Sequence, residues 1–549
     1  MRTGTRRSGG LALLLACLLT LSLLCGCVGG PPSIQGESSG ADDASARYLV
    51  AIEDEPDTVD FQSTTIYYTI ATNVFDRLVE MESDAEGKVC IQPSLAESWE
   101  VSEDGRCYTF HLRHGVKFSN GAPLTSSDVL YTLTRLLTWP EGCNRDIAEG
   151  IVGAKRLERG ETLSLEGFKL LGELDFSITL EEPFEAFLAC ISMPGASILD
   201  GESTEAAGDR FGLDPACTIG TGPFILESWE PGVGMLLRAN PDCWSGAPKC
   251  AGLDLRFLTE PEDVRAMFEK GELDLLDLDE VGSAAEFFLH GDIYQANLHH
   301  VNRISIVYIA MNETVKPLND VRVRKALQYA LNREVLLDAA YSGRGAVENG
   351  IYPHGLYGYN PDLPEIPYDP EAAKELLTEA GYSRGFDLTF SVKASSTEWE
   401  MTLVRLAVSM WEKLGVRTTI RVLDESEFMR LRKSGELECY TAMWTADYND
   451  PDNFVYTFFG NKANTTFRSL CYQNEAVMDR VYRARTIADP DARLREYREL
   501  EELIVQEDAA WIPLFSRLYS YVCQDWVEGF RSTWNGSVKN AYRSISIRQ

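Results

Sequence analysis

The sequence predicts a mixed α/β protein with more than one lobe, and three observations lead to this fold class. Segments with the apolar pattern of strands alternate along the chain with segments of helical pattern, as in sheets covered by helices. The chain has 549 residues, too many for one ordinary hydrophobic core, so that two to four lobes are expected. Apolar residues make up 44% of the chain, a share typical of a folded globular protein.

Strands are expected where apolar residues cluster or alternate between turn signals. Residues 48–52 (YLVAI) predict a buried strand. Residues 98–101 and 108–112 alternate with period two on either side of a Glu-Asp-Gly turn and predict a hairpin. A second strand pair is expected at residues 224–229 and 235–238, across a Pro-Gly turn.

Helices are expected where capping residues precede an apolar pattern of helical period. Residues 125–128 (TSSD) have the chemistry of a helix N-cap. Residues 320–340 predict one helix that carries several arginines, and residues 369–377 predict another, with Asp at the cap and Pro in the first turn. A third helix is expected at residues 399–414, followed by a strand at 418–422.

The charge of the chain is strongly negative, with 84 acidic and 51 basic residues and a net charge of −33. Contacts to nucleic acid phosphates need clustered Lys and Arg, so no nucleic acid partner is expected. The field weakly favours cationic or zwitterionic ligands. The alternative is that most of this charge simply forms a solvated acidic surface.

The N-terminus has the pattern of an export signal. Arg2, Arg6 and Arg7 precede an apolar run at residues 11–24, which is too short to span a bilayer comfortably. The run ends in Leu-Cys-Gly-Cys, which resembles the lipobox of bacterial lipoproteins. This resemblance implies that residues 1–26 are a signal peptide and that Cys27 carries a diacylglycerol anchor. An ordinary signal peptide with a chance cysteine is the alternative.

The anchor implies a location on the outer face of the cell membrane, which is the periplasmic side in a Gram-negative cell. Residues 27–46 are rich in Gly, Ser, Asp and Pro and predict a tether. Ten further cysteines would lie in an oxidising compartment, where Cys243 with Cys250 and Cys90 with Cys107 are candidate disulfides. The sequence contains no C-x-x-C motif, so neither a redox pair nor a zinc knuckle is expected.

Several short motifs occur in the order in which they occur in one known family. They are residues 55–60 (EPDTVD), 95–99 (LAESW), 115–121 (GVKFSNG), 124–129 (LTSSDV), 220–224 (GTGPF), 240–244 (NPDCW), 271–274 (GELD), 320–324 (DVRVR) and 368–374 (YDPEAAK). Together they resemble the family 5 extracellular solute-binding proteins, which serve peptide and nickel import by ABC transporters. The similarity extends over nearly the whole chain after the tether.

This resemblance implies a bilobal fold of the periplasmic-binding-protein type II class with an additional third lobe. Lobe I is expected at residues 47–77, 216–305 and 510–549, the extra lobe II at 78–215, and lobe III at 306–509. Such proteins close on their ligand about a hinge. The resemblance also implies a monomer that captures a peptide, delivers it to a permease and its ATPase, catalyses no reaction and needs no cofactor or metal.

The candidate ligand site is the segment 441–451 (TAMWTADYNDP). It resembles the family's ligand-contact segment, in which the Asp three residues after a Trp holds the α-ammonium of the peptide; here that residue is Asp447. A desolvated ammonium needs a fixed anion and further acceptors. Trp444 and Tyr448 would offer ring faces, and Met443 and Thr445 are further candidate contacts. The alternative is that Asp447 and Asp450 only cap a turn before a proline.

The remaining contacts of a peptide are less specified by the sequence. An extended peptide can pair its backbone with exposed strand edges, and Thr65 and Tyr67 are candidate contacts in the loop at residues 62–68. Oligopeptide binders often have an Arg three residues before the Trp, able to bind the peptide carboxylate, but here that residue is Thr441. Arg432 is a candidate replacement, and a surface arginine is the alternative.

Two other function classes remain open. A different solute, such as an oligosaccharide, a nickel chelate or an opine-like compound, is the alternative within binding proteins. A nickel site would need histidines in the cleft, whereas the adjacent pair His299 and His300 is expected on the surface. An exported hydrolase is the remote alternative, because the sequence has no G-x-S-x-G, H-E-x-x-H or G-x-x-x-x-G-K-[ST] motif.

Overall fold

The structure is a computed structural model that describes residues 47–64, 67–83, 89–258, 260–282, 284–531 and 542–548. The expected signal peptide, Cys27, the tether and Thr65 lie outside these residues. Within them, no helix has the length and apolar character needed to cross a membrane.

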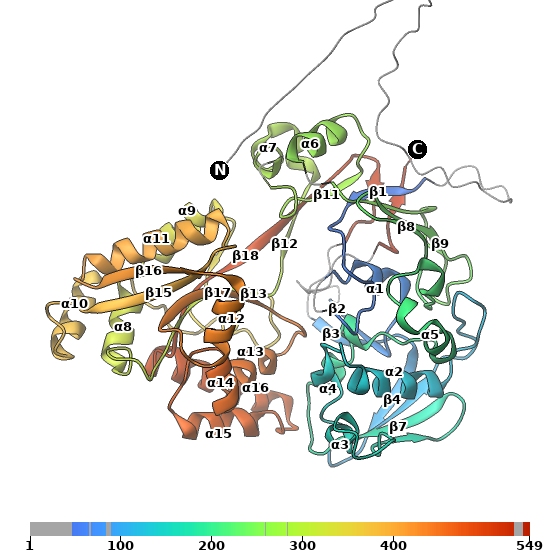
Figure 1. Ribbon diagram of the computed structural model, residues 1–549, viewed down its shortest axis with the longest axis horizontal. Coiled ribbons are helices and arrows are strands. Elements are labelled where there is room, and N and C mark those ends of the chain that lie inside the picture. Colours follow the sequence, from blue (N-terminus) through green and yellow to red (C-terminus); the bar gives the residue numbers. More distant parts are fainter. Residues whose placement is uncertain are drawn as a thin grey trace, which may run out of the picture. The chain divides into compact units, whose positions relative to one another are not determined.

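The described chain contains one large mixed sheet, to which strands from β1 to β18 contribute (Figure 1). Its strands follow the order β16-β15-β17-β13-β18-β11-β1-β10-β9-β8, and β12 and β14 also pair with β18. The strands are β1 (Leu49–Ile52), β8 (Phe224–Glu230), β9 (Gly234–Ala239), β10 (Gly252–Arg256), β11 (Leu275–Asp277), β12 (Leu298–Asn302), β13 (Ser305–Met311), β14 (Gly345–Val347), β15 (Asp387–Lys393), β16 (Arg417–Leu423), β17 (Cys439–Thr445) and β18 (Trp511–Cys523).

Strand β18 connects the two halves of this sheet because it is long enough to serve both. Its first half pairs antiparallel with β13 and β14, and its second half pairs with β12 and β11. Figure 1 shows it in red, extending from β13 and β17 toward β11. Most of its side chains are buried, as expected for a central strand covered on both faces.

Two smaller sheets lie in the segment between β1 and β8: a four-stranded antiparallel sheet of order β4-β5-β7-β6, and the pair of β2 and β3. A third small sheet, the pair of β19 and β20, follows β18. Their bounds are β2 (Val79–Ser83), β3 (Val89–Pro93), β4 (Ala96–Val101), β5 (Cys107–Leu112), β6 (Phe168–Leu170), β7 (Asp175–Thr179), β19 (Val527–Glu528) and β20 (Ser546–Ile547). The predicted hairpin at 98–112 is therefore confirmed as β4 and β5.

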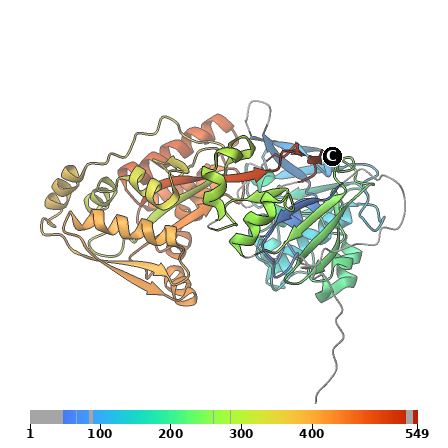
Figure 2. The same ribbon diagram turned by 90° about the horizontal axis from the view of Figure 1, so that it is seen from above.

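Helices cover these sheets. In Figure 2, the orange helix α11 lies beside the orange strands β15 and β16. The α-helices are α1 (Thr69–Val74), α2 (Ser126–Thr138), α3 (Ala154–Glu158), α4 (Phe187–Cys190), α5 (Gly201–Ala207), α6 (Pro261–Glu269), α7 (Ala284–His290), α8 (Val321–Tyr329), α9 (Arg333–Tyr341), α10 (Pro370–Glu379), α11 (Glu398–Glu412), α12 (Glu425–Lys433), α13 (Pro451–Phe459), α14 (Lys462–Phe467), α15 (Glu475–Ala484) and α16 (Pro490–Glu502).

Residues 320–340 form two helices, α8 and α9, and not the one helix expected from the sequence. The side chain of Asn332 accepts a hydrogen bond from the Val335 N–H at 3.1 Å and so acts as the N-cap of a new helix. A capping side chain gives the backbone a local alternative to continuing the preceding helix.

The buried apolar residues form separate cores. One consists of residues between Leu78 and Ile198, joined by the single distant side chain of Tyr448. Two cores cover the two faces of the sheet around β13, and two more surround β1, β10 and β11. The limits of the three expected lobes stay a prediction.

The expected disulfides do not form. Cys243, Cys250, Cys90 and Cys107 are free thiols in the structure. The Cys90 Sγ lies on β3 beside the Glu82 carbonyl and the Gln92 amide, whereas Cys107 is on β5 beside Thr179. The Cys243 Sγ contacts Ser245 Oγ at 3.3 Å, and the Cys250 side chain packs in the core around β1. Nearness in sequence therefore did not bring these thiols together.

Candidate functional site

A cavity of about 290 Å³, here called the Asp447 cavity, lies between two segments that are far apart in the sequence. The N-terminal wall comes from residues 146–190 and the C-terminal wall from residues 444–485. The lining residues are Asp146, Glu149, Phe184 and Cys190 on the N-terminal wall, and Trp444, Asp447, Tyr448, Asn453, Tyr456, Thr457, Asn464, Phe467, Arg468 and Arg485 on the C-terminal wall.

Asp447 lies in the turn between the end of β17 and the start of α13. The Ala446 N–H donates to the Ile304 carbonyl at 2.8 Å, which holds the strand end in place. Asp450, not Asp447, caps α13, since its carboxylate accepts the Asp452 N–H at 2.9 Å and pairs with Arg493 at 2.6 Å. The capping alternative therefore applies to Asp450 and does not account for Asp447.

Asn453, on the first turn of α13, orients Asp447. Its Nδ2 donates to Asp447 Oδ2 at 3.1 Å, and its Oδ1 accepts the Asp447 N–H at 3.0 Å. Desolvation by the surrounding walls raises the pKa of Asp447, although the bond from Asn453 and the charge of Arg468 partly offset this effect. The carboxylate would thus gain from a further cation.

Asp146 brings a second carboxylate to the cavity from the N-terminal wall. The Asp146 side chain lines this cavity and is exposed. Desolvation, followed by the negative charge of Asp447, raises the pKa of Asp146 to about 6. The pair is an acidic site whose two members come from walls about 300 residues apart.

Two arginines contribute positive charge to the C-terminal wall, in different ways. Arg485 pairs with Asp452 at 3.0 Å and lies between the rings of Phe184 and Tyr456, 4.5 and 3.8 Å from their centroids. Arg468 lies over the ring of Trp444, 4.6 Å from its centroid, and desolvation lowers its pKa. The sequence analysis singled out neither arginine, and neither stands in a motif that would have marked it.

Of the residues expected to bind ligand, three line the Asp447 cavity. These are Asp447, Trp444 and Tyr448. The indole Nε1 of Trp444 donates to Asn453 Oδ1 at 3.2 Å. Tyr448 is only 7% exposed and donates to Asp452 at 3.1 Å, so that little of its ring is available to a ligand.

The expected contacts Met443, Thr445 and Arg432 are not among the described residues that line this cavity. Met443 and Thr445 are on β17, opposite Val307 and Ser305 of β13. Arg432 is on α12, with its guanidinium 5.5 Å from the ring centroid of Phe467. Their roles stay predictions.

Thr64 and Tyr68 both bond to Asn144, which stands just before the N-terminal wall in the sequence. Tyr67 has a φ of 62°, a left-handed conformation that is uncommon for a residue with a side chain. The next residue, Tyr68, donates its hydroxyl to the Thr64 carbonyl at 2.9 Å, and Asn144 Nδ2 donates to that same carbonyl at 2.9 Å. Burial raises the pKa of Tyr68, and the nearby negative charge of Asp447 adds to this effect. The role of Tyr67 in binding stays a prediction.

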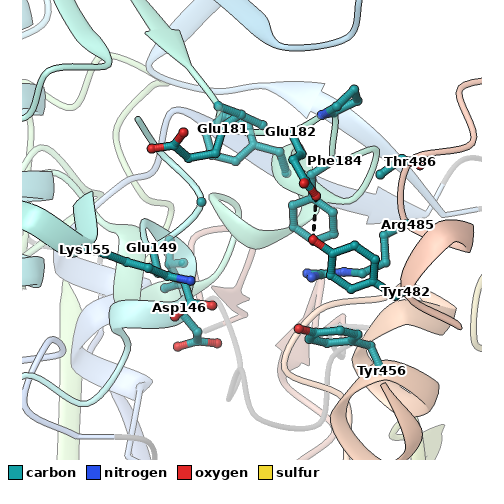
Figure 3. A pocket seen from close by; sticks show the side chains of 15 residues that line it. Asp146, Glu149, Lys155, Glu181, Glu182, Phe184, Tyr456, Tyr482, Arg485 and Thr486 are labelled. Carbon is teal, nitrogen blue, oxygen red and sulfur yellow. Dashed lines mark hydrogen bonds between the residues drawn. The ribbon is translucent and has the colours of Figure 1, made fainter. Parts of the chain in front are cut away.

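A second cavity of about 350 Å³, here called the Glu182 cavity, adjoins the first (Figure 3). The two cavities share five lining residues, which are Asp146, Glu149, Phe184, Tyr456 and Arg485. Across the Glu182 cavity the Tyr482 hydroxyl donates to Glu182 Oε2 at 2.6 Å, drawn as a dashed line in Figure 3. The Glu185 N–H also donates to the Arg485 carbonyl at 3.4 Å, so hydrogen bonds join the two walls directly.

In the described part of the chain, no three His, Cys, Asp or Glu side chains gather in a way that could hold a metal ion. His299 and His300 are exposed on β12, and the His300 ring contacts Ser520 Oγ at 2.9 Å.

Known proteins with similar sequences and structures cover most of the chain. The chain is 29% identical over 462 residues to heme-binding protein A of Haemophilus influenzae, covering 82% of this chain and 83% of that protein. It is 29% identical over 506 residues to the dipeptide-binding protein of Escherichia coli K12, covering 89% and 91%. The structure of HbpA2 from Haemophilus parasuis matches with a TM-score of 0.75 at 25% identity, over 92% of this chain and 100% of that chain.

The fold and the cavity between two walls define an extracytoplasmic substrate-binding protein of an ABC transporter, a class that binds solutes and does not transform them. More specifically, the chain belongs to the bacterial extracellular solute-binding proteins, family 5, whose model matches residues 91–466. The family resemblance inferred from the sequence motifs and the mixed α/β periplasmic-binding-protein fold are thereby confirmed.

Proposed function

We propose that this protein captures peptides by their N-terminal ammonium in the Asp447 cavity and delivers them to a permease and its ATPase. The observation that carries the proposal is the placement of Asp447: a carboxylate oriented by Asn453 lines a cavity between two walls. Similarity to the dipeptide-binding protein of Escherichia coli K12 supports the same ligand class.

A peptide ammonium matches the electrostatics of this cavity. It has three N–H donors, and the Asp447 carboxylate is an acceptor, as its bond from Asn453 shows. The raised pKa values of Asp447 and Asp146 reflect carboxylates that are poorly solvated, and an added cation would relieve this cost. Carboxylates from both walls would then approach one cation, which favours the closed arrangement of the walls.

The proposed function also includes attachment of the protein to the membrane and closure of its lobes. Cys27 would carry the lipid that holds the protein at the outer face of the membrane. The three lobes expected at residues 47–77 with 216–305 and 510–549, at 78–215, and at 306–509 would close about the strands that connect them.

The experiment compares free dipeptides with their N-acetylated forms in Asp447→Asn and in the wild type. We expect the substitution to weaken binding of the free-amine form by about 100-fold, as for removal of one member of a desolvated charge pair, and to leave the weak binding of the acetylated form unchanged. Asp424→Asn, at the exposed N-cap of α12, is the matched control. Equal losses for both forms of the peptide would remove the ammonium role from Asp447.

A further inference from the structure

We propose that a third cavity, of about 290 Å³, is a second ligand site that binds an apolar primary amine and joins the two walls. It is called the Glu185 cavity below. None of the described residues that line it lines the Asp447 cavity or the Glu182 cavity. Binding of an amine here does not depend on the proposed peptide function, and only its effect on peptide affinity does.

The segment 184–190, which contains α4, has two faces that line different cavities. Phe184, Phe187 and Cys190 line the Asp447 cavity, the Glu182 cavity or both. Residues three apart lie on one face of a helical turn, and the Phe187 N–H donates to the Phe184 carbonyl at 3.0 Å. The residues between these three line the Glu185 cavity: Glu185, Ala186, Leu188 and Ala189. One turn of the chain therefore separates the new cavity from the two already described.

The C-terminal wall lines the opposite side of the Glu185 cavity with residues that are held in place. The Asn449 Oδ1 accepts the Tyr357 N–H at 2.6 Å. Arg493 donates two hydrogen bonds to the Asp450 carboxylate, at 2.6 and 2.8 Å. Asn449 and Asp450 belong to the turn that carries Asp447. A ligand in the Glu185 cavity would therefore contact both walls, close to the segment that carries the candidate peptide site.

Apolar side chains make up most of the lining of the Glu185 cavity. They come from β2, β3, α4, the loop before α10 and the first turn of α16: Met81, Ile91, Leu188, Tyr357 and Pro490. Of these, Met81, Ile91 and Leu188 pack against the core of the segment 78–198 but stay partly exposed. An apolar ligand would remove this surface from water, which favours binding.

The lining contains one carboxylate whose charge is not compensated. The charges of Asp450 and Arg493 cancel, because the two side chains form a bidentate pair. The Glu185 carboxylate forms no hydrogen bond or ion pair with another residue that the structure describes. Desolvation raises the pKa of Glu185, and the positive charge of Arg493 partly offsets this effect. A cation would relieve the cost of this desolvation, so the lining matches an apolar chain that ends in an ammonium.

The Glu185 cavity would be coupled to the Asp447 cavity through the arrangement of the walls. A ligand that contacts both walls binds most tightly when the walls lie together. A peptide in the Asp447 cavity is proposed to favour the same arrangement. Two ligands that favour one arrangement raise each other's affinity. This part of the inference rests on the proposed function.

Cys90 can report occupation of the Glu185 cavity, because its free thiol lines it. The exposed free thiol of Cys143 lines none of the three cavities and serves as the internal reference. Alkylation of both thiols by N-ethylmaleimide is followed by mass spectrometry. The protein carries Asp447→Asn, so that the amine finds no carboxylate at that position. The probes share one skeleton and are 4-phenylbutylamine, the neutral 4-phenylbutanol and the anionic 4-phenylbutyrate.

We expect 4-phenylbutylamine to slow alkylation of Cys90 at least about fivefold, with half of the effect at about 0.1–1 mM, and to leave Cys143 unchanged. The alcohol should need at least about tenfold higher concentration, because it lacks the charged partner of Glu185, and the anion more still. Glu185→Gln should remove the preference for the amine over the alcohol. Glu182→Gln, the same change at the Glu182 cavity, should keep this preference.

Three outcomes would overturn the amine site. They are equal protection of Cys90 by the amine and the alcohol, equal slowing of Cys90 and Cys143, and a preference for the amine that is lost in Glu182→Gln but kept in Glu185→Gln. The first two are measured without any change at Glu185, so they do not depend on how that variant folds. Thermal unfolding of each variant separates loss of the fold from loss of the site.

A second measurement tests the coupling between the two cavities. Calorimetric titration of the wild type with Ala-Ala should show about fivefold tighter binding in saturating 4-phenylbutylamine than without it. Unchanged or weaker binding of Ala-Ala would overturn the coupling, and weaker binding would show that the amine competes for Asp447. If Ala-Ala does not bind at all while the amine still protects Cys90, the peptide function is overturned and the amine site stands.

Discussion

The Asp447 cavity and the Glu182 cavity are lined by the same two walls, but they differ in how far some of their charged side chains are exposed to water. In the Asp447 cavity a carboxylate is held by Asn453, and the walls withdraw it from water. In the Glu182 cavity the side chains of Glu181, Glu182 and Lys155 are exposed. Charges withdrawn from water interact strongly, while exposed charges are screened. In the proposed function, the first cavity would select the charged ends of a ligand and the second would tolerate what extends beyond them.

The largest expected effect tests this contrast directly. Asp447→Asn should weaken binding of a free dipeptide about 100-fold, whereas Glu182→Gln, an equivalent change in the adjoining cavity, should change it less than about threefold. Calorimetric titration of both variants with the same dipeptide measures the two effects. Comparable losses of dipeptide affinity in the two variants would mean that the charged side chains of the two cavities contribute equally to binding.

A second prediction concerns the residue that orients Asp447. Asn453→Ala removes the acceptor of the Asp447 N–H and of the Trp444 indole, and the donor to the Asp447 carboxylate. Leaving such groups unpaired typically costs ~1–3 kcal/mol. We expect the free energy of unfolding to fall by about 2 kcal/mol in urea titrations, and dipeptide affinity to fall about tenfold. An unchanged affinity would show that Asp447 needs no orientation by Asn453.

The third prediction uses the pH dependence of Asp146. Its pKa is raised to about 6 in the folded protein from an ordinary value of 3.8, so the folded state binds more protons than the unfolded chain between these values. Stability is then expected to decrease as the pH rises through this window. Urea unfolding of the wild type and of Asp146→Asn at pH 4.5 and pH 7 measures the difference. The variant should lose less stability over this interval, and parallel behaviour of the two proteins would contradict the raised pKa.

The sequence predicted most of the elements and singled out one residue that lines the candidate cavity, and the reasons are physical. The hairpin of β4 and β5 and the cap of α2 follow from local period and local side-chain chemistry. Asp447 could be singled out because it stands in a motif beside Trp444. Asp146 could not, because it reaches the cavity from a distant segment, and Arg468 could not, because it stands in no motif that marks it.

The free thiols also show that sequence alone does not determine which side chains meet. Cys90 and Cys107 are close in sequence, yet they belong to different sheets. Local pattern thus determines which element a residue joins, while packing of elements determines which side chains meet. The cavity-lining residues that the sequence did not indicate are those whose position depends only on how the elements pack.

The smallest expected effect concerns the hydrogen bond between the walls at the Glu182 cavity. Tyr482→Phe removes the donor to Glu182 and keeps the ring, which lies 6.5 Å from the ring of Tyr456. Because the Tyr482 side chain is 43% exposed, water can replace the lost partner, and the closed arrangement should lose only about 0.5–1 kcal/mol. Dipeptide affinity should therefore fall by about two- to fivefold, through faster dissociation in stopped-flow measurements. A loss as large as that of Asp447→Asn would mean that contact between the walls, and not the desolvated charge, dominates ligand capture.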